Sequence, residues 1–145
     1  MKKMNNKGFS LVELIIVIAI MAVLIGVLAP QFIKYVERSR ESTDLQNVEE
    51  VKTAVEAYVA DHGEDMSGSI VVEVNTAKTQ AMYGSDDLVT KTPGLGEYGI
   101  DSGKKLKSKK WTDNKIEWTY SLTNYKWTPT AGSATYFYVD GTPKS

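Results

Sequence analysis

The most distinctive segment of the chain is FSLVELIIVIAIMAVLIGVLAPQFI, residues 9 to 33. Twenty of its 25 residues are hydrophobic, and Glu13 carries the only formal charge inside it. A helix rises about 1.5 Å per residue, so this segment is long enough to cross the ~30 Å hydrocarbon core of a bilayer. The sequence therefore predicts a membrane-spanning helix near the N-terminus, followed by a remainder of ordinary, mixed composition.

Composition excludes several functional classes. The chain has 145 residues, no Cys and one His, which rules out disulfide frameworks, thiolate metal clusters and Cys nucleophiles. The sequence carries no GxSxG, HExxH, P-loop or EF-hand pattern. The net charge of -1 gives no global signature of nucleic-acid binding. We therefore expect no enzyme activity, no catalytic residues, no metal site and no cofactor.

Charge also predicts the orientation of the helix. Lys2, Lys3 and Lys7 precede the apolar segment without any acid, and the positive-inside rule places such a leader in the cytoplasm. An ordinary secretory signal peptide is the first alternative, but its apolar core has only ~7 to 15 residues. The best small-residue cleavage site ends at Ala29 and is followed by Pro30. An anchor with its N-terminus inside and its C-terminus outside fits better.

Glu13 needs an explanation, because a carboxylate inside hydrocarbon costs at least a few kcal/mol. No Lys or Arg lies between Lys7 and Lys34. Glu13 either reaches the lipid headgroups, or stays protonated near the interface, or finds a cation supplied by cleavage of the chain or by another chain.

The residues around Glu13 resemble a known processing signal. The run Lys7-Gly8-Phe9-Ser10-Leu11-Val12-Glu13-Leu14, behind a basic leader and ahead of an apolar run, resembles the class III signal of type IV prepilins and related pseudopilins. The resemblance implies that a prepilin peptidase cleaves between Gly8 and Phe9 and methylates the new amine of Phe9. It also implies that Glu13 pairs with that terminal amine, largely of a neighbouring subunit, during filament assembly.

Two features of the helix favour packing against other helices. Small residues recur at spacings of three and four and form one face, as in close-packed membrane helices: Ala19, Ala22, Gly26 and Ala29. Pro30 lacks the donor for the bond to residue 26, so a kink or local loss of helix is expected at Gly26 and Pro30. By resemblance, pilins lose helix here when packed in the filament.

The helix is predicted to continue to His62 as an amphipathic segment, and Gly63 suits the position after its end. Its apolar stripe consists of Leu45, Val48, Val51, Val55 and Tyr58. Strands are predicted at Ser69–Val74, Ile116–Leu122, Tyr125–Thr128 and Thr135–Val139, a short helix at Thr76–Tyr83, and a turn at Pro93–Gly96. The last three strands form an antiparallel meander with an aromatic core that covers the stripe. The expected fold class is α+β, and the resemblance implies a pilin fold with a sheet of three strands or slightly more.

Five lysines lie within seven positions, at Lys104, Lys105, Lys107, Lys109 and Lys110. Such a run suits a contact with DNA, anionic glycans or lipid headgroups, although a solvated loop is the preferred interpretation. The acidic pairs Glu64-Asp65 and Asp86-Asp87 are interpreted as solvated rather than as cation sites.

The expected organisation is a leader at 1–8, a transmembrane polymerisation helix at 9–33 and a globular headgroup at 34–145. The expected function is that of a structural subunit of a type IV pilus, anchored in the cytoplasmic membrane as precursor and extracellular in the filament. Its partners would be copies of itself, prepilin peptidase, the assembly platform and minor pilins, with nucleic acid not indicated. A pseudopilin of type II secretion or competence is the nearest alternative. A membrane-anchored binding domain that never polymerises is a more distant one.

Overall fold

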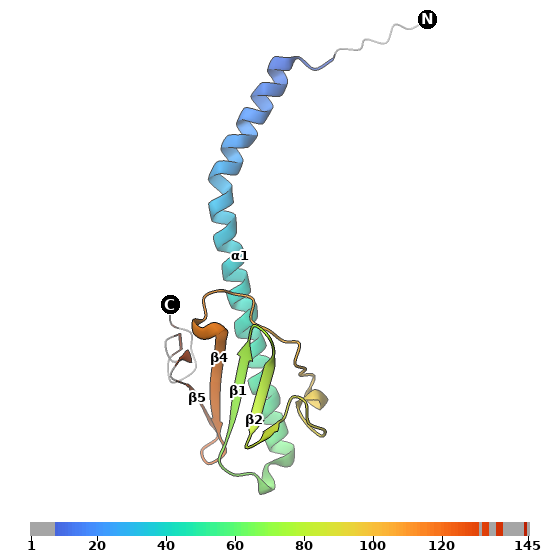
Figure 1. Cartoon of the computed structure of the whole chain (residues 1–145), viewed down its shortest axis with the longest axis vertical. Coiled ribbons are helices and arrows are strands. Elements are labelled where there is room, and N and C mark those ends of the chain that lie inside the picture. The colour runs from blue at the N-terminus through green and yellow to red at the C-terminus, as the bar shows by residue number, and fades with distance from the viewer. Residues whose placement is uncertain (1–7, 131, 134–135, 138–143, 145) are drawn as a thin grey trace, which may run out of the picture. The chain divides into compact units, whose positions relative to one another are not determined.

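The computed structural model describes residues 8–130, 132–133, 136–137 and 144. Its contacts divide the chain into two compact units, Met1–Val36 and Glu37–Ser145. One helix, α1, contributes to both units and runs from Leu11 to His62 (Figure 1). The long helix predicted from residue 9 to residue 62 is confirmed, with its start two residues later.

Helix α1 is unbroken at Pro30, which lies inside it. The sequence predicts a kink or a local loss of helix there; the isolated chain keeps the helix, and loss of helix on packing in a filament stays a prediction. A proline removes a single backbone donor from the helix, and the hydrogen bonds of the neighbouring turns remain to hold the backbone. At the other end, the ring of His62 stacks on that of Tyr58 with 4.7 Å between centroids, and the 3-10 turn η1, Gly63–Asp65, follows.

The second unit contains a five-stranded antiparallel sheet in the order β3-β2-β1-β4-β5. The strands are β1 (Ser69–Asn75), β2 (Thr79–Tyr83), β3 (Asp86–Asp87), β4 (Lys115–Ser121) and β5 (Lys126–Pro129). The central strand β1 pairs with β2 on one side and β4 on the other, and Val72 lies opposite both Ala81 and Trp118. Two further 3-10 elements follow η1 along the chain, η2 (Leu95–Tyr98) and η3 (Thr112–Asn114).

The short helix predicted at Thr76–Tyr83 is wrong, because this segment turns back and forms β2. The side-chain oxygen of Asn75 accepts hydrogen bonds of 2.8 Å from the backbone N–H groups of Ala77 and Lys78, which closes a tight turn after β1. Pairing with β1 then fixes the extended backbone. Thr135, Tyr138 and Val139 of the last predicted strand lie outside the described residues.

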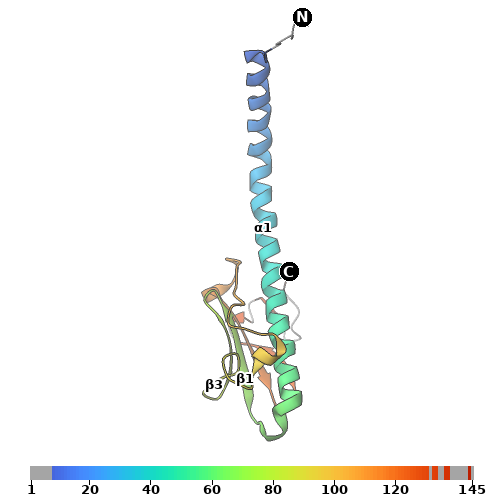
Figure 2. The same cartoon turned by 90° about the vertical axis from the view of Figure 1, so that its right-hand side faces the viewer.

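The core of the second unit lies between the sheet and residues 48–59 of α1, which form two layers (Figure 2). Val51 and Val55 are fully buried, as are Ile70 of β1 and Trp118 of β4. Aromatic rings fill the rest of this space: Phe137 packs on Trp118 with 5.1 Å between centroids. The α+β pilin fold and the aromatic core predicted from the sequence are therefore confirmed.

Gly94 is required by close packing. A Cβ atom at this position would collide with the backbone carbonyl oxygens of Lys91 and Leu88. The next residue, Leu95, is fully buried and donates its N–H to the Leu88 carbonyl at 2.7 Å. The turn predicted here thus leads into η2, whose Tyr98 hydroxyl reaches Asp61 of α1 at 2.6 Å.

Candidate functional site

The expected processing site is accessible in the first unit. Gly8 lies in non-helical backbone just before α1, and a Cβ atom there would meet no other atom within 4 Å. The side chain of Phe9 is 92% exposed. The peptide bond between Gly8 and Phe9 therefore lies in an open segment of the kind that a peptidase can bind.

Glu13 makes a contact within its own helix that was not predicted from the sequence. Its Oε2 accepts a hydrogen bond of 2.9 Å from the backbone N–H of Ser10, the residue before the helix. The carbonyl of Ser10 accepts from the N–H of Leu14 at 3.2 Å. This is the carboxylate half of a capping box, in which the third helical residue satisfies the N–H of the cap residue. The spacing of Ser10 and Glu13 ahead of an apolar run was the available signal.

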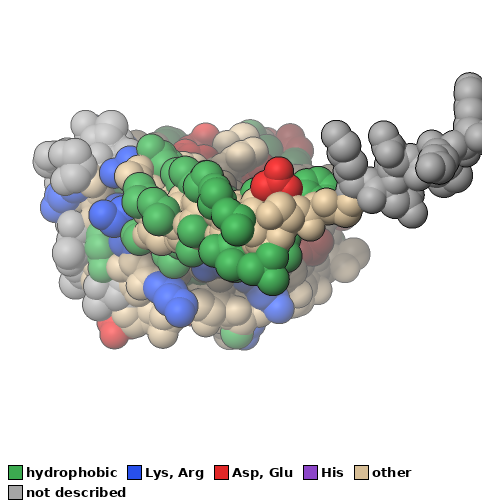
Figure 3. Space-filling model, turned by 90° about the horizontal axis from the view of Figure 1, so that it is seen from above, with side chains coloured by type: hydrophobic (Ala, Val, Ile, Leu, Met, Phe, Trp, Pro, Cys, Tyr) green, Lys and Arg blue, Asp and Glu red, His purple; other side chains and the backbone are tan. Residues whose placement is uncertain are grey.

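The membrane-compatible part of α1 is covered with apolar side chains (Figure 3). Every large hydrophobic residue from Phe9 to Ile33 is exposed, by between 46% for Val17 and 92% for Phe9. Within the described residues, α1 is long and apolar enough to cross a membrane. Such a continuous apolar surface in water would be strongly unfavourable, so it calls for lipid or for other helices.

The small residues of this segment are also exposed, as the described part of α1 shows for Ala19, Ala22, Gly26 and Ala29. A Cβ atom at Gly26 would meet no other atom within 4 Å. The isolated chain thus leaves this face open to a second helix, and Pro30 lies one residue beyond it.

In the second unit, the core-facing stripe of α1 begins with acids. Glu37, Glu41 and Asp44 occupy the positions that precede Val48 at spacings of three and four. Asp44 is fully buried, whereas acids are almost never fully buried without partners. An acid at a position of the core stripe was the sequence signal for a bound partner, and it was missed.

The partner is the lysine-rich loop. Asp44 Oδ1 accepts from the backbone N–H of Lys107, and its Oδ2 accepts from the N–H of Ser108 and from the indole Nε1–H of Trp111, each at 2.8 Å. Glu37 Oε1 accepts from the hydroxyl of Ser108 and the N–H of Lys109, both at 2.7 Å. We call these five bonds the carboxylate clasp. It ties α1 to a loop that follows more than 60 residues later.

The clasp also changes the ionisation of Glu37. The hydrogen bond from the Ser108 hydroxyl, followed by that from the Lys109 N–H, lowers the pKa of the Glu37 carboxyl below its usual value, against a smaller opposing effect of desolvation. The ionised carboxylate is the form that accepts both bonds.

The five lysines of the loop are used in different ways. Lys104 pairs with Glu50, and the Lys110 ammonium lies 3.1 Å from Glu41. Lys105, Lys107 and Lys109 are exposed, and within the described residues their ammonium groups make no hydrogen bond or ion pair. The preferred expectation of a plain solvated loop is therefore too simple, because the backbone of this segment is fixed to α1.

Of the two acidic pairs, Asp86-Asp87 is bound within its own segment. Asp87 accepts from the N–H groups of Ala81 and Val89, both at 3.1 Å, and Asp86 pairs with Lys91 at 2.5 Å. Among the described residues, no group of three or more His, Asp or Glu is placed to hold a metal ion.

Comparison with known proteins agrees with these features. Residues 3–29 match the family model of a prokaryotic N-terminal methylation motif. A type IV major fimbrial protein, FimA, of Dichelobacter nodosus is 31% identical over 121 residues, which cover 81% of this chain and 74% of that protein. A fimbrial protein of Neisseria meningitidis serogroup A is 32% identical over 78% of this chain and 71% of its own length.

A third relative, the type IV major pilin protein PilA of Myxococcus xanthus, is 38% identical over 57 residues, 39% of this chain and 26% of that protein. No solved structure gives a significant match. Two relatives above 30% identity are covered over more than two thirds of their length, and the methylation motif and the helix-and-sheet fold agree with them. The chain belongs to the type IV pilin family.

Proposed function

We propose that this pilin is a structural subunit of a type IV pilus filament rather than an enzyme. The observation that carries the proposal is the apolar surface of α1 between Phe9 and Ile33, which is exposed in the isolated chain and requires lipid before assembly and neighbouring helices after it. The proposed organisation is a leader at 1–8, a polymerisation helix at 9–33 and a headgroup at 34–145.

Processing is proposed to occur between Gly8 and Phe9, by a prepilin peptidase that then methylates Phe9. The match of residues 3–29 to the methylation motif and the exposure of this segment support it. The precursor would lie with Lys2, Lys3 and Lys7 in the cytoplasm and its headgroup outside. Assembly would then involve the platform, minor pilins and further copies of the chain.

Glu13 is proposed to guide each subunit into the filament. After cleavage, the terminal amine of Phe9 is a cation near neutral pH, and it can neutralise a carboxylate in a membrane environment. The small face at Ala19, Ala22, Gly26 and Ala29 is proposed to pack against neighbouring helices. Gly26 and Pro30 mark the turn at which α1 would lose helix under that packing.

The test combines shearing of cell-surface filaments with mass spectrometry of the subunit N-terminus. Methylated Phe9 in long filaments is expected. Methylated Phe9 without surface filaments would instead identify a pseudopilin. An intact Met1, or cleavage after Ala29, would refute the proposed processing.

Two variants at one position separate charge pairing from capping. Glu13→Ala removes both, whereas Glu13→Gln keeps an oxygen that can accept from the Ser10 N–H but has no charge. We expect both to be cleaved after Gly8 and both to give few filaments. Glu64→Ala, which removes an exposed acid of the headgroup, is the control and should assemble normally. Normal filament yield from Glu13→Gln would show that charge pairing is not required.

A further inference from the structure

The lysine-rich loop has a regular exposed face. Lys105, Lys107 and Lys109 are exposed, whereas Leu106 and Ser108 between them are 5% and 3% exposed. Alternation with period two is that of an extended segment, in which every second side chain points the same way, about 6 to 7 Å apart. The three lysines, which we call the lysine row, therefore share one outward side.

The fold does not use the charges of the lysine row. The segment is held through its backbone: the N–H of Leu106 bonds to the Asn75 carbonyl at 3.0 Å, and those of Lys107 and Lys109 bond to Asp44 and Glu37. In the described part of the chain, the three ammonium groups have no acidic partner. The clasp thus presents three cations on a fixed backbone and leaves them available to a ligand.

The lysine row lies near the point where the chain leaves the apolar segment. Lys109 is bonded to Glu37, and Glu37 follows Ile33 by four residues. Four residues span about 6 Å in a helix and at most about 14 Å when fully extended. The polar interface of a bilayer is about 5 to 8 Å thick on each side. A chain anchored through residues 9–33 therefore holds Lys109 within reach of lipid headgroups, and Lys107 follows at Asp44, 11 residues beyond Ile33 and about 16 Å along the helix.

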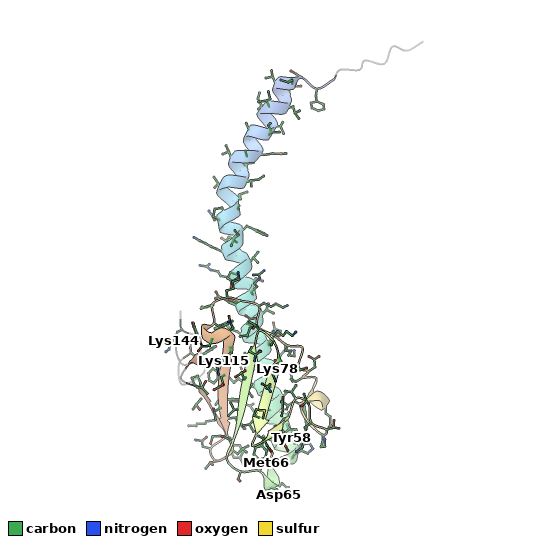
Figure 4. The ribbon with its side chains drawn as sticks, in the orientation of Figure 1. Tyr58, Asp65, Met66, Lys78, Lys115 and Lys144 are labelled. Carbon is green, nitrogen blue, oxygen red and sulfur yellow. The ribbon has the colours of Figure 1, made fainter. Side chains whose placement is uncertain are left out.

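The headgroup is also polarised in charge. Lys78 and Lys115 lie at one end of the sheet, where the loop bonds to Asn75, and Asp65 lies at the opposite end (Figure 4). Lys115 is paired with Glu73 and Glu117, so among the described residues the free cations of this end are those of Lys78 and the lysine row. Between Thr53 and Val72, around that opposite end, the sequence has four acids and no Lys or Arg. An anionic surface would attract the lysine end and repel the other.

A hollow of about 600 Å³ opens beside the lysine row. Lys104, Lys105 and Lys107 line it together with the small or neutral residues Thr76 and Gly103, and Asp101 contributes one acid. Its size is within the range of small-ligand sites. We propose that the lysine row and this hollow bind the polar head groups of anionic phospholipids. This binding would dock the globular part of the membrane-anchored pilin on the bilayer before assembly.

This inference rests on the proposed membrane-anchored precursor. Its test measures docking of the lysine row separately from anchoring of the chain. The full chain carries no Cys, so Ser102→Cys, at an exposed position beside the loop, gives a unique site for a fluorophore. The labelled chain is reconstituted in vesicles of phosphatidylcholine, with or without about 30% phosphatidylglycerol. A nitroxide on the lipid headgroup serves as quencher, and flotation measures anchoring.

We expect quenching to rise several-fold when phosphatidylglycerol is present and to fall again in 0.5 M salt, because such attraction is screened. Lys107→Ala with Lys109→Ala should abolish the rise. The matched control, Lys91→Ala with Lys126→Ala, removes two exposed lysines elsewhere and should retain it.

A chain that floats with both kinds of vesicle but shows equal quenching refutes the docking and leaves the membrane anchor intact. A chain that does not float refutes both. A response to added duplex DNA without a response to phosphatidylglycerol would overturn the assignment to lipid and favour nucleic acid. Unchanged quenching in the Lys107 and Lys109 variant would refute the role of the lysine row.

Discussion

Replacement of Asp44 by alanine is the sharpest test of how the headgroup is held together. Asp44 is fully buried and accepts three hydrogen bonds, from Lys107, Ser108 and Trp111, each at 2.8 Å. Asp44→Ala leaves all three donors without their acceptor. The bonds from Ser108 and Trp111 are buried and that from Lys107 is part-buried. An unsatisfied buried donor costs about 1 to 3 kcal/mol, so we expect a loss of about 3 kcal/mol in the free energy of unfolding.

A loss of this size would be a large share of the ~5 to 15 kcal/mol that stabilises a typical domain. It corresponds to a decrease of about 12 °C in Tm for a unit the size of Glu37–Ser145. All three tryptophans of the chain, Trp111, Trp118 and Trp127, lie in this unit. Their fluorescence therefore reports headgroup unfolding in urea, even with the full chain in detergent.

Two further variants calibrate the measurement. Asp44→Asn can keep its oxygen at the position that accepts from Ser108 and Trp111. It should lose about a third as much stability, because its amide nitrogen cannot accept the bond from Lys107. Asp65→Ala removes an exposed acid and should change stability by less than about 0.5 kcal/mol. A loss below about 1 kcal/mol for Asp44→Ala would refute the view that the clasp fastens the loop to α1.

Three further predictions concern other contacts of the headgroup. Leu95→Ala removes a fully buried side chain and should cost about 2 to 5 kcal/mol in urea unfolding; a loss under about 1 kcal/mol would contradict its placement in the core. The hydrogen bond to Asp61 raises the pKa of Tyr98 to about 12. The stability that this bond contributes is therefore complete below pH 10 and lost between about pH 10 and 12. Tyr98→Phe should flatten the dependence of Tm on pH in that range, and an unchanged dependence would show that this pair does not cause the loss. The Ser108 hydroxyl and Lys109 N–H lower the pKa of Glu37. The stability that ionised Glu37 contributes is therefore present at neutral pH and is lost as the pH falls through and below the usual carboxyl range. Glu37→Gln should reduce the loss of Tm on acidification, and equal acid sensitivity of both proteins would count against the clasp.

The elements that were predicted correctly are those with a strong period. The 3.6-residue stripe through Val48, Val51 and Val55 defined the second half of α1, and the alternation around Trp118 defined β4. In contrast, Thr79–Tyr83 consists of residues that suit a helix as well as a strand. Its conformation is decided by the Asn75 turn and by pairing with β1, which are contacts that local preference does not contain.

The sequence motif predicted which residues take part in processing and assembly, but not the hydrogen bonds that the structure shows. Gly8, Phe9 and Glu13 followed from a motif, and their roles in processing and assembly stay predictions. The bond from Ser10 to Glu13 was readable as a capping pattern but was missed. Asp44 at a position of the core stripe was a signal for a bound partner, but the partner itself could not be predicted, because the loop follows more than 60 residues later and local patterns do not place it against α1.

The position of the clasp has a mechanical consequence. Glu37 and Asp44 lie in the first two turns of α1 within the headgroup unit, so tension applied through the N-terminal segment reaches their hydrogen bonds before it reaches the rings around Trp118. A filament pulled along its axis would therefore load Lys107, Ser108 and Lys109 first. We expect rupture of those bonds to release the loop while the sheet is still paired, so that the headgroup would extend in two steps.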